Sequence, residues 1–264
     1  MLYVCIPSYN EAPTVGLLLW KIRQTFTAFP REYQLLVVDD ASTDATSEVL
    51  EPYTRVLPLT VVRHTNRRGY AASLESLLRL SLERTDRPKR DAAIVMHADF
   101  GHSPAYLPDL VRRLDSGADM VVAEGTLTGE PSRARRLVRR LGPRLLRNAV
   151  HAPGVSDVIS GFLAFRLVTL RNAMREHEHR LLTLDGWAAN AELIGKTARL
   201  ARRVDTVATV ERHDLRQRPS RVVPLDAALE LWRARRQLRV SPPLPPRSAP
   251  APEPRAEREA GVAT

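Results

Sequence analysis

The sequence predicts an α/β fold in which a largely parallel sheet lies between two layers of helices. Short apolar runs alternate with segments of helical periodicity through the first half of the 264-residue chain. Two of these runs, LLVV and AAIVM, are continuously hydrophobic, which is typical of strands covered on both faces. Polar clusters follow four of the runs, and the carboxyl ends of strands are where an open α/β sheet binds its ligands. The same pattern therefore predicts both the fold class and the place of a site.

The expected elements follow one another in a repeated strand-helix order. The strands cover residues 2–6, 34–38, 58–63, 92–96 and 119–123, and helices begin near Thr14, Thr43, Tyr70 and Pro104. Later helices are expected from about Asp185 and over residues 225–238. We therefore expect one main domain over residues 1–222, a C-terminal helix over 223–240, and a disordered tail over 241–264, which is rich in proline and charge.

Residues 132–150 combine apolar side chains on one face with seven arginines around the other. The apolar side chains are Leu137, Val138, Leu141, Leu145 and Leu146. The Gly142-Pro143 pair predicts an interruption, so this segment is interpreted as two short basic amphipathic helices. Such helices either lie on an anionic membrane surface or pack as ordinary helices on the core.

Charge and cysteine content narrow the function classes. A formal net charge of +10, dominated by arginine, favours anionic partners such as nucleotides, sugar phosphates, acidic lipid or nucleic acid, although a merely soluble basic surface has the same composition. Cys5 is the single cysteine, which excludes an internal disulfide and a cysteine metal cluster and fits a reducing cytoplasmic location. No apolar run approaches the roughly 18 residues that a membrane span needs. We therefore expect a cytoplasmic protein that is soluble or at most peripheral at the inner membrane face.

The four polar clusters are Pro7-Ser8-Tyr9-Asn10-Glu11, Asp39-Asp40, residues 64–68 and His97-Ala98-Asp99. A single cluster means little, because Asp and Asn also form turns and helix caps. Two common phosphate-binding motifs are absent from the sequence: no G-x-G-x-x-G follows a strand, and Gly195-Lys196-Thr197 lacks the upstream glycine of a P-loop. The clusters must therefore be explained by another kind of site.

Six motifs occur in an order that resembles the inverting, GT-A fold glycosyltransferases of family 2. They are VCIPSYNEAPTVGLLL, LLVVDDASTDAT, VVRHTNRRGYAAS, IVMHADFGHSP, SDVISGFLAFR and the segment from NAELIGKTARLA to RPSRV. The nearest likeness is to the branch that contains dolichol- and polyprenyl-phosphate mannosyltransferases, and it covers about residues 1–222. This resemblance implies a GT-A fold and a nucleotide-diphosphate sugar donor.

The resemblance also implies residues that bind the nucleotide sugar. Pro7, Tyr9 and Glu11 match the first nucleotide-contacting loop, with the tyrosine ring on the base, although a turn and a helix start is the alternative. Asp39 resembles the aspartate that accepts a hydrogen bond from the base, with Asp40 as its weaker neighbour; the stretch from Asp40 to Thr43 is alternatively a helix cap.

The resemblance also implies basic residues at the donor site. Arg68 occupies a position that turns toward the nucleotide, unless it is a solvated surface charge. Arg216, Arg218 and Arg221 resemble a closing loop over the diphosphate, where they would stabilise the leaving group. Surface basicity beside a disordered tail is the alternative for these three.

His97-Ala98-Asp99 stands where the family usually has Asp-Ala-Asp. The resemblance implies a divalent cation, Mn²⁺ or Mg²⁺, that bridges the donor phosphates, with Asp99 as the principal ligand and Ala98 beside the nucleotide sugar. The first carboxylate is replaced by His97, whose imidazole suits manganese better than magnesium, so a weakly held metal is expected. A second departure is Thr126, which replaces an arginine of the mannosyl-phosphate branch.

Acceptor-side residues are implied by the later motifs. Ser160 and Gly161 are expected to line the site, with a plain tight turn as the alternative, and Glu192 matches the acid of the family's last core helix. Asp185 lies where inverting relatives place a general base, and equally where a helix N-cap would stand. A phosphate acceptor is already ionised at neutral pH and needs no strong base.

The sequence is therefore interpreted as an inverting glycosyltransferase whose acceptor is a lipid phosphate or another hydroxyl or phosphate group. Asp99 and Asp185 are the expected catalytic residues. A catalytically impaired GT-A protein that binds sugar nucleotides is the alternative that His97 and Thr126 favour. A basic nucleic-acid binder is a third interpretation, disfavoured because the arginines have no interleaved aromatic residues on which bases would stack.

Overall fold

The computed structural model describes residues 1–129, 133–177, 180–212 and 223–239. Arg216, Arg218, Arg221 and the tail over residues 241–264 lie outside the described residues. Within the described part, no helix is long and apolar enough to cross a bilayer.

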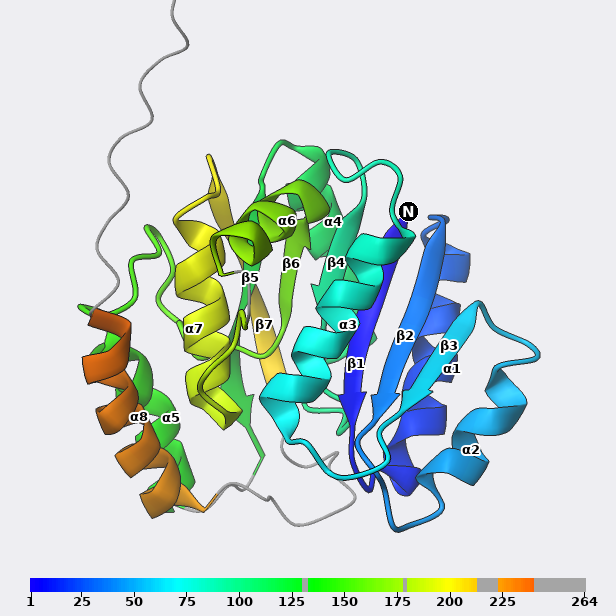
Figure 1. The fold of residues 1–264 in the computed structure, drawn as a ribbon, viewed down its shortest axis with the longest axis horizontal. Coiled ribbons are helices and arrows are strands. Elements are labelled where there is room, and N and C mark those ends of the chain that lie inside the picture. Colours follow the sequence, from blue (N-terminus) through cyan, green and yellow to red (C-terminus); the bar gives the residue numbers. More distant parts are fainter. Residues whose placement is uncertain (130–132, 178–179, 213–222, 240–264) are drawn as a thin grey trace, which may run out of the picture.

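A central seven-stranded sheet confirms the predicted fold class (Figure 1). Its order is β3-β2-β1-β4-β6-β5-β7. The strands are β1 (Leu2–Ser8), β2 (Tyr33–Asp39), β3 (Leu59–Arg63), β4 (Ala92–Val95), β5 (Met120–Thr128), β6 (Leu163–Arg166) and β7 (Val204–Arg212). Strand β6 runs antiparallel to β4 and β5, while the other neighbouring pairs are parallel. The sheet is therefore mostly parallel, as expected.

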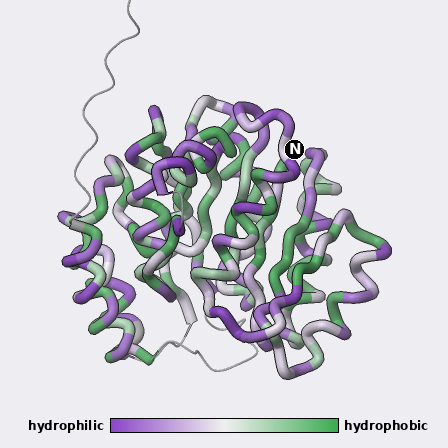
Figure 2. Tube along the Cα trace, viewed as in Figure 1, coloured by the Kyte–Doolittle hydropathy of each residue, from purple (hydrophilic) through white to green (hydrophobic). Residues whose placement is uncertain are grey.

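Helices cover both faces of this sheet. They are α1 (Ala12–Ala28), α2 (Thr46–Tyr53), α3 (Tyr70–Arg84), α4 (Leu107–Asp115), α5 (Arg133–Leu146), α6 (Leu167–Glu176), α7 (Gly186–Ala198) and α8 (Pro224–Arg239). Alternate residues of β1 enter two separate cores, with Tyr3 and Cys5 on the α3 side and Val4 and Ile6 on the α1 side. Figure 2 shows the hydrophobic strands passing through the interior between these layers.

Two strands were not among the five that the sequence predicted. Strand β6 has only four residues and lies within the SDVISGFLAFR motif, from which the acceptor-side residues Ser160 and Gly161 were predicted. Strand β7 lies at the edge of the sheet beside β5, and its first half is only partly buried. Its sequence, VDTVATVER, contains no continuous apolar run. Pairing with neighbours, rather than local pattern, defines both strands.

Residues 133–146 form one helix, which corrects the expected break at Gly142-Pro143. Pro143 removes only its own backbone donor, and the helix continues through it. Helix α8 packs closely on α5 at Gly142, where a Cβ atom would lie 2.9 Å from the Leu231 Cδ1 atom. Of the five predicted apolar residues on this helix, Leu146 is buried, Val138 and Leu145 pack on the core, and Leu137 and Leu141 are exposed. Core packing therefore accounts for part of this apolar face and leaves two leucines outside it.

Candidate active site

A cavity of about 410 Å³ lies at the carboxyl ends of β1, β2 and β4. Its lining includes Pro7, Ser8, Tyr9 and Glu11 from the β1–α1 loop, Asp40 after β2, and His97, Ala98 and Asp99 after β4. The start of α3, the start of α7 and one side of α8 complete the wall. The structure thus brings the predicted strand-end clusters together, as the parallel sheet requires.

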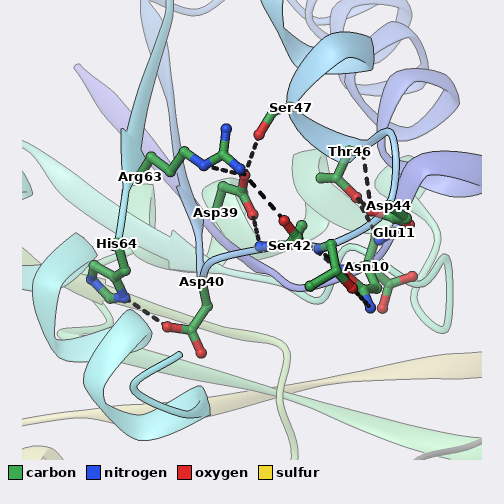
Figure 3. Close-up of polar contacts among 11 residues, drawn as sticks. Asn10, Glu11, Asp39, Asp40, Ser42, Asp44, Thr46, Ser47, Arg63 and His64 are labelled. Atoms are coloured by element: carbon green, nitrogen blue, oxygen red, sulfur yellow. Dashed lines mark hydrogen bonds and ion pairs between the residues drawn. The ribbon is translucent and has the colours of Figure 1, made fainter. Parts of the chain in front are cut away.

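The loops after β1 and β2 are joined by a dense set of hydrogen bonds (Figure 3). The Asn10 backbone N–H donates to Ser42 Oγ at 2.9 Å, and the Thr43 N–H donates to Asn10 Oδ1 at 2.8 Å. The Glu11 N–H donates to Thr46 Oγ1 at 2.9 Å, at the start of α2. These bonds hold the Tyr9 and Glu11 segment against the β2–α2 loop and order the cavity floor.

Three loops around the cavity contain a non-glycine residue with left-handed backbone. They are Asn10 with φ 49°, Ala41 with φ 57° and Phe100 with φ 61°. This conformation is costly for alanine and phenylalanine, at about 1–3 kcal/mol each, and persists where surrounding bonds impose it. Ser42 N–H donates to Asp39 Oδ1 and Gly101 N–H donates to Asp99 Oδ1, one residue beyond Ala41 and Phe100 respectively. Such enforced turns are concentrated at functional sites.

The two aspartates after β2 have different surroundings. Asp39 is fully buried and is not among the cavity-lining residues; its carboxylate accepts hydrogen bonds from the Ser42 N–H and the Ser47 hydroxyl and lies 3.7 Å from Arg63 Nε. Asp40, in contrast, lines the cavity. A hydrogen bond between Asp39 and the base of a nucleotide stays a prediction.

Asp40 also organises the β3–α3 connection. Its carboxylate accepts hydrogen bonds from His64 Nδ1 at 2.7 Å and from the Arg68 and Gly69 N–H groups at 2.8 Å each. Burial alone would raise the pKa of Asp40, but these hydrogen bonds outweigh it and lower the pKa below its usual value. Asp40 therefore carries a negative charge at neutral pH. It does not cap α2, because the N-cap residue of that helix is Ala45.

Arg67, and not the predicted Arg68, lines the cavity. The Arg67 guanidinium lies over the Tyr9 ring, 4.2 Å from its centroid, whereas Arg68 contributes its backbone N–H to Asp40. The sequence signal was present, since the two arginines are adjacent, but their side-chain directions were not readable from it.

His97 and Asp99 follow β4 and both line the cavity. The His97 ring stacks on Tyr70 with ring centroids 5.1 Å apart, and a Cβ atom on Gly161 would lie only 2.0 Å from His97 Nε2. Gly161 is therefore required by the position of His97. Ser160 is fully buried and is not a lining residue, because its hydroxyl donates to the Ala123 carbonyl at 2.6 Å.

Residues 3–172 match the model described as glycosyl transferase family 2. The chain belongs to this family.

Two curated relatives match over part of their length. The dolichol-phosphate mannosyltransferase of Pyrococcus furiosus is 26% identical over 168 residues, which cover 62% of this chain and 45% of that protein. The polyprenol monophosphomannose synthase of Mycolicibacterium smegmatis is 27% identical over 168 residues, covering 62% of this chain and 60% of that protein. The match therefore spans about half the length of these relatives.

A solved structure shows the same fold. The glucosyl-3-phosphoglycerate synthase from Mycobacterium tuberculosis, in complex with Mn²⁺, uridine-diphosphate-glucose and phosphoglyceric acid, has a TM-score of 0.57 at 20% identity. The similarity covers 92% of this chain and 80% of that chain. It supports the predicted GT-A arrangement of this family 2 chain.

Asp185 stands at the N-cap position of α7 in this family 2 site, but its side chain does not cap that helix. Its Oδ1 atom accepts a hydrogen bond from the Ala71 N–H at 2.9 Å, at the start of α3. A Cβ atom on Gly69 would lie 2.9 Å from Asp185 Oδ2, and the φ of Gly69 is 91°, so both space and backbone conformation require glycine there. Asp185 thus lines the cavity while joining α7 to α3.

Glu192 is buried in α7 and is not among the cavity-lining residues. Its carboxylate accepts hydrogen bonds from the Thr183 and Leu184 N–H groups at 2.7 and 3.0 Å and pairs with Lys196 at 2.7 Å. These bonds hold the segment directly before Asp185. Glu192 therefore positions the cavity wall rather than forming it.

Helix α8 forms a wall of the cavity that the sequence did not predict. Asp226, Ala227 and Glu230 line the cavity, and the two carboxylates are spaced four residues apart, as on one side of a helix. Burial first, and then the charges of Asp185 and Asp226, raise the pKa of Glu230. The α8 side of the cavity is therefore acidic, and the i, i+4 pair was the available signal. Tyr70 and Trp187 are further lining residues that were not predicted.

A second, basic cleft of about 820 Å³ lies beside the α5 helix. Its lining includes Arg140, Arg144 and Arg147 together with Thr126 on β5 and residues 150–158. Arg139, which also lines the cleft, is largely buried and pairs with Asp157 at 2.6 Å and Glu211 at 3.1 Å. These two carboxylates raise the pKa of Arg139 against the opposing effect of burial. The exposed arginines of this cleft supply a surface suited to phosphate groups.

The described residues of the cavity could bind a divalent cation only together with ligands from a bound substrate. No group of three or more His, Cys, Asp or Glu side chains among them forms a metal cluster. His97 and Asp99 nevertheless offer an imidazole and a carboxylate on one loop of the cavity, a donor set compatible with Mn²⁺. A bound cation would require donor phosphate oxygens to complete its coordination shell.

Proposed function

We propose that this chain transfers a sugar from a nucleotide-diphosphate sugar to an acceptor, with inversion at the anomeric carbon. The observation that carries the proposal is the convergence of the β1, β2 and β4 loops on one cavity that contains Tyr9, Asp40, His97 and Asp99. Inversion requires the acceptor to attack opposite the leaving diphosphate. Holding donor and acceptor in that line is the main contribution of such a site.

The donor end of the cavity would be formed by residues of three loops. Tyr9 offers a ring for the base and Arg67 a guanidinium beside it, while Asp40 keeps the β3–α3 connection in place. His97 and Asp99 would hold a divalent cation, which when bound would neutralise charge on the departing diphosphate. The predicted arginines between residues 213 and 222 would add to that neutralisation.

A polyprenyl phosphate is the proposed acceptor. The relatives named above are a dolichol-phosphate mannosyltransferase and a polyprenol monophosphomannose synthase. The basic cleft beside α5 provides three arginines that suit a phosphate. The acidic α8 side of the cavity would repel a phosphate, which favours approach from the α5 side. An ionised phosphate has no proton to lose to a base, so Asp185 would not need to act as one. Its hydrogen bond from the Ala71 N–H would instead hold the start of α7 against the start of α3.

A thermal-shift panel of nucleotide sugars with and without Mn²⁺ or Mg²⁺ tests the donor site. We expect one donor to raise the unfolding temperature, more strongly with Mn²⁺, because it binds the folded state alone. Asp99→Ala should lose the metal-dependent part of the shift, and His97→Asp should retain or increase it. Transfer to a polyprenyl phosphate is then measured with the donor that binds. If no donor stabilises the protein, the proposal fails.

Binding without turnover is the alternative that His97 favours, because it replaces a carboxylate of the metal motif. The same panel separates the two: donor stabilisation without product formation in the presence of Mn²⁺ supports a catalytically impaired protein. Metal-dependent product formation excludes it.

A further inference from the structure

Helix α8 has apolar residues on two opposite faces. Ala227, Leu231 and Ala234 are buried against the core, where α8 packs on α5 and α7. Leu225, Leu229 and Trp232 are 80%, 45% and 46% exposed. With 3.6 residues per turn, these three residues lie on the side of the helix away from the buried face. A helix that only covered a core would have polar residues there.

The exposed face, defined as Leu225, Leu229, Trp232 and Arg236, is both apolar and basic. The Arg236 guanidinium lies over the Trp232 ring, 4.8 Å from its centroid, and Arg233 is exposed on the same helix. The carboxylates of α8, Asp226 and Glu230, line the cavity instead. The neighbouring α5 adds exposed Leu137 and Leu141 and the arginines of the basic cleft. Apolar side chains with a tryptophan and a surround of arginine are typical of helices that lie in a lipid interface.

Helix α8 also connects this face to the cavity. Figure 1 shows α8 and α5 together at the edge of the molecule farthest from α2. One side of α8 supplies Asp226, Ala227 and Glu230 to the cavity wall, so a single helix, about 10 Å across, separates the exposed face from the site. If this face bound a membrane, the cavity would lie close to the lipid headgroups.

We propose that the exposed face of α8 docks the protein on an anionic lipid bilayer, with α8 lying in the plane of the interface. The inference rests on the proposed function, since it supplies a lipid acceptor to the same site. Charge favours a bilayer over a second copy of the chain as the binding partner. The chain carries a formal charge of +10, so a second copy would present the same basic surface and be repelled, whereas anionic lipid headgroups attract this surface.

Vesicle co-sedimentation of the full chain tests this surface. We expect binding to vesicles of equal parts phosphatidylcholine and phosphatidylglycerol, weaker binding to phosphatidylcholine alone, and release by salt, which screens the arginines. The double variant Leu229→Gln/Trp232→Gln should bind about tenfold more weakly, because polar side chains replace the inserted apolar ones. Its matched control is Leu17→Gln/Trp20→Gln, which alters exposed apolar residues on α1 and should bind like the wild type.

Tryptophan fluorescence gives a second readout. Adding the anionic vesicles should shift the emission of the wild type to shorter wavelength as Trp232 leaves water, and Trp232→Phe should lose that shift while still binding. Equal vesicle binding by the wild type and Leu229→Gln/Trp232→Gln would overturn the proposal. A concentration-dependent dimer that the same double variant abolishes would also overturn it. Donor-induced thermal shifts are measured in parallel without vesicles, so loss of docking with intact donor binding contradicts only this inference.

Discussion

At the scale of single residues, the cavity depends on close contacts between small and large side chains. Gly161 lies against the His97 imidazole with no room for a Cβ atom, and Gly69 leaves room for the Asp185 carboxylate. That Gly161 contacts the acceptor stays a prediction. Each glycine is required because the residue that it touches must occupy a defined position in the cavity wall.

Gly161→Ala is expected to weaken donor binding and to destabilise the fold by about 1–3 kcal/mol, because the new methyl group overlaps His97. Urea unfolding and the donor-induced thermal shift measure the two effects. The double variant Gly161→Ala/His97→Ala should recover stability without recovering metal-dependent donor binding. An unchanged stability of Gly161→Ala would show that His97 does not pack on this residue.

At the scale of elements, the short connections between strands and helices place the site. Asp40 at the end of β2 binds the connection between β3 and α3, and Glu192 in α7 binds the segment before Asp185. Each buried carboxylate accepts hydrogen bonds from backbone N–H groups of a connecting segment: the Arg68 and Gly69 N–H groups for Asp40, and the Thr183 and Leu184 N–H groups for Glu192. The segments that lead into α3 and α7 are therefore each held by a buried carboxylate, and Asp185 joins the two helices through the Ala71 N–H.

Asp40→Asn should lower the free energy of unfolding at pH 7 by about 1–3 kcal/mol, since three donors lose a charged acceptor. The pKa of Asp40 is lowered in the folded protein, so its contribution is present above the ordinary aspartate pKa and is lost as the pH falls through the lower folded value. The difference between wild type and variant should therefore shrink in acid. Urea titrations from neutral pH to about pH 3 measure it.

The surface variant Asp86→Asn is the control, because Asp86 is highly exposed and pairs only with Arg87 at 3.3 Å among the described residues. Its unfolding free energy should stay within about 0.5 kcal/mol of the wild type at every pH. A constant difference between Asp40→Asn and the wild type across the titration would contradict the assigned pKa shift.

At the scale of the whole molecule, α8 belongs to the same core as the family-matched region. Leu231 and Ala234 lie in the hydrophobic cluster that includes residues of β1, β4, α3 and α7. We therefore expect calorimetric unfolding in a single transition, with equal calorimetric and van't Hoff enthalpies. A separate low-temperature transition would show instead that α8 is an independent unit, as the sequence-based division at residue 222 had suggested.

Much of the fold was accessible from the sequence because its signals are local. Continuous apolar runs predicted β1, β2 and β4, and helical periodicity predicted α3 from Tyr70 and α8 over 225–238. Strands β6 and β7 were missed because their identity comes from pairing with β5 rather than from pattern. The single α5 helix was missed because Gly142-Pro143 indicates a break locally, whereas the helix continues through both residues and packs on α8 beside Leu231.

The sequence by itself determined the fold class, the family resemblance and the strand ends at which a site must form. These features depend on local patterns, namely apolar runs that alternate with helical segments and polar clusters that follow the runs. Only the tertiary structure decided that Asp40 and Arg67 face the cavity while Asp39, Ser160 and Glu192 do not line it. It also decided that α8 supplies one wall of the site and an exposed apolar face. These outcomes depend on side-chain directions and on contacts between segments distant in sequence. Both are fixed by packing in the folded chain and are not visible in local sequence patterns.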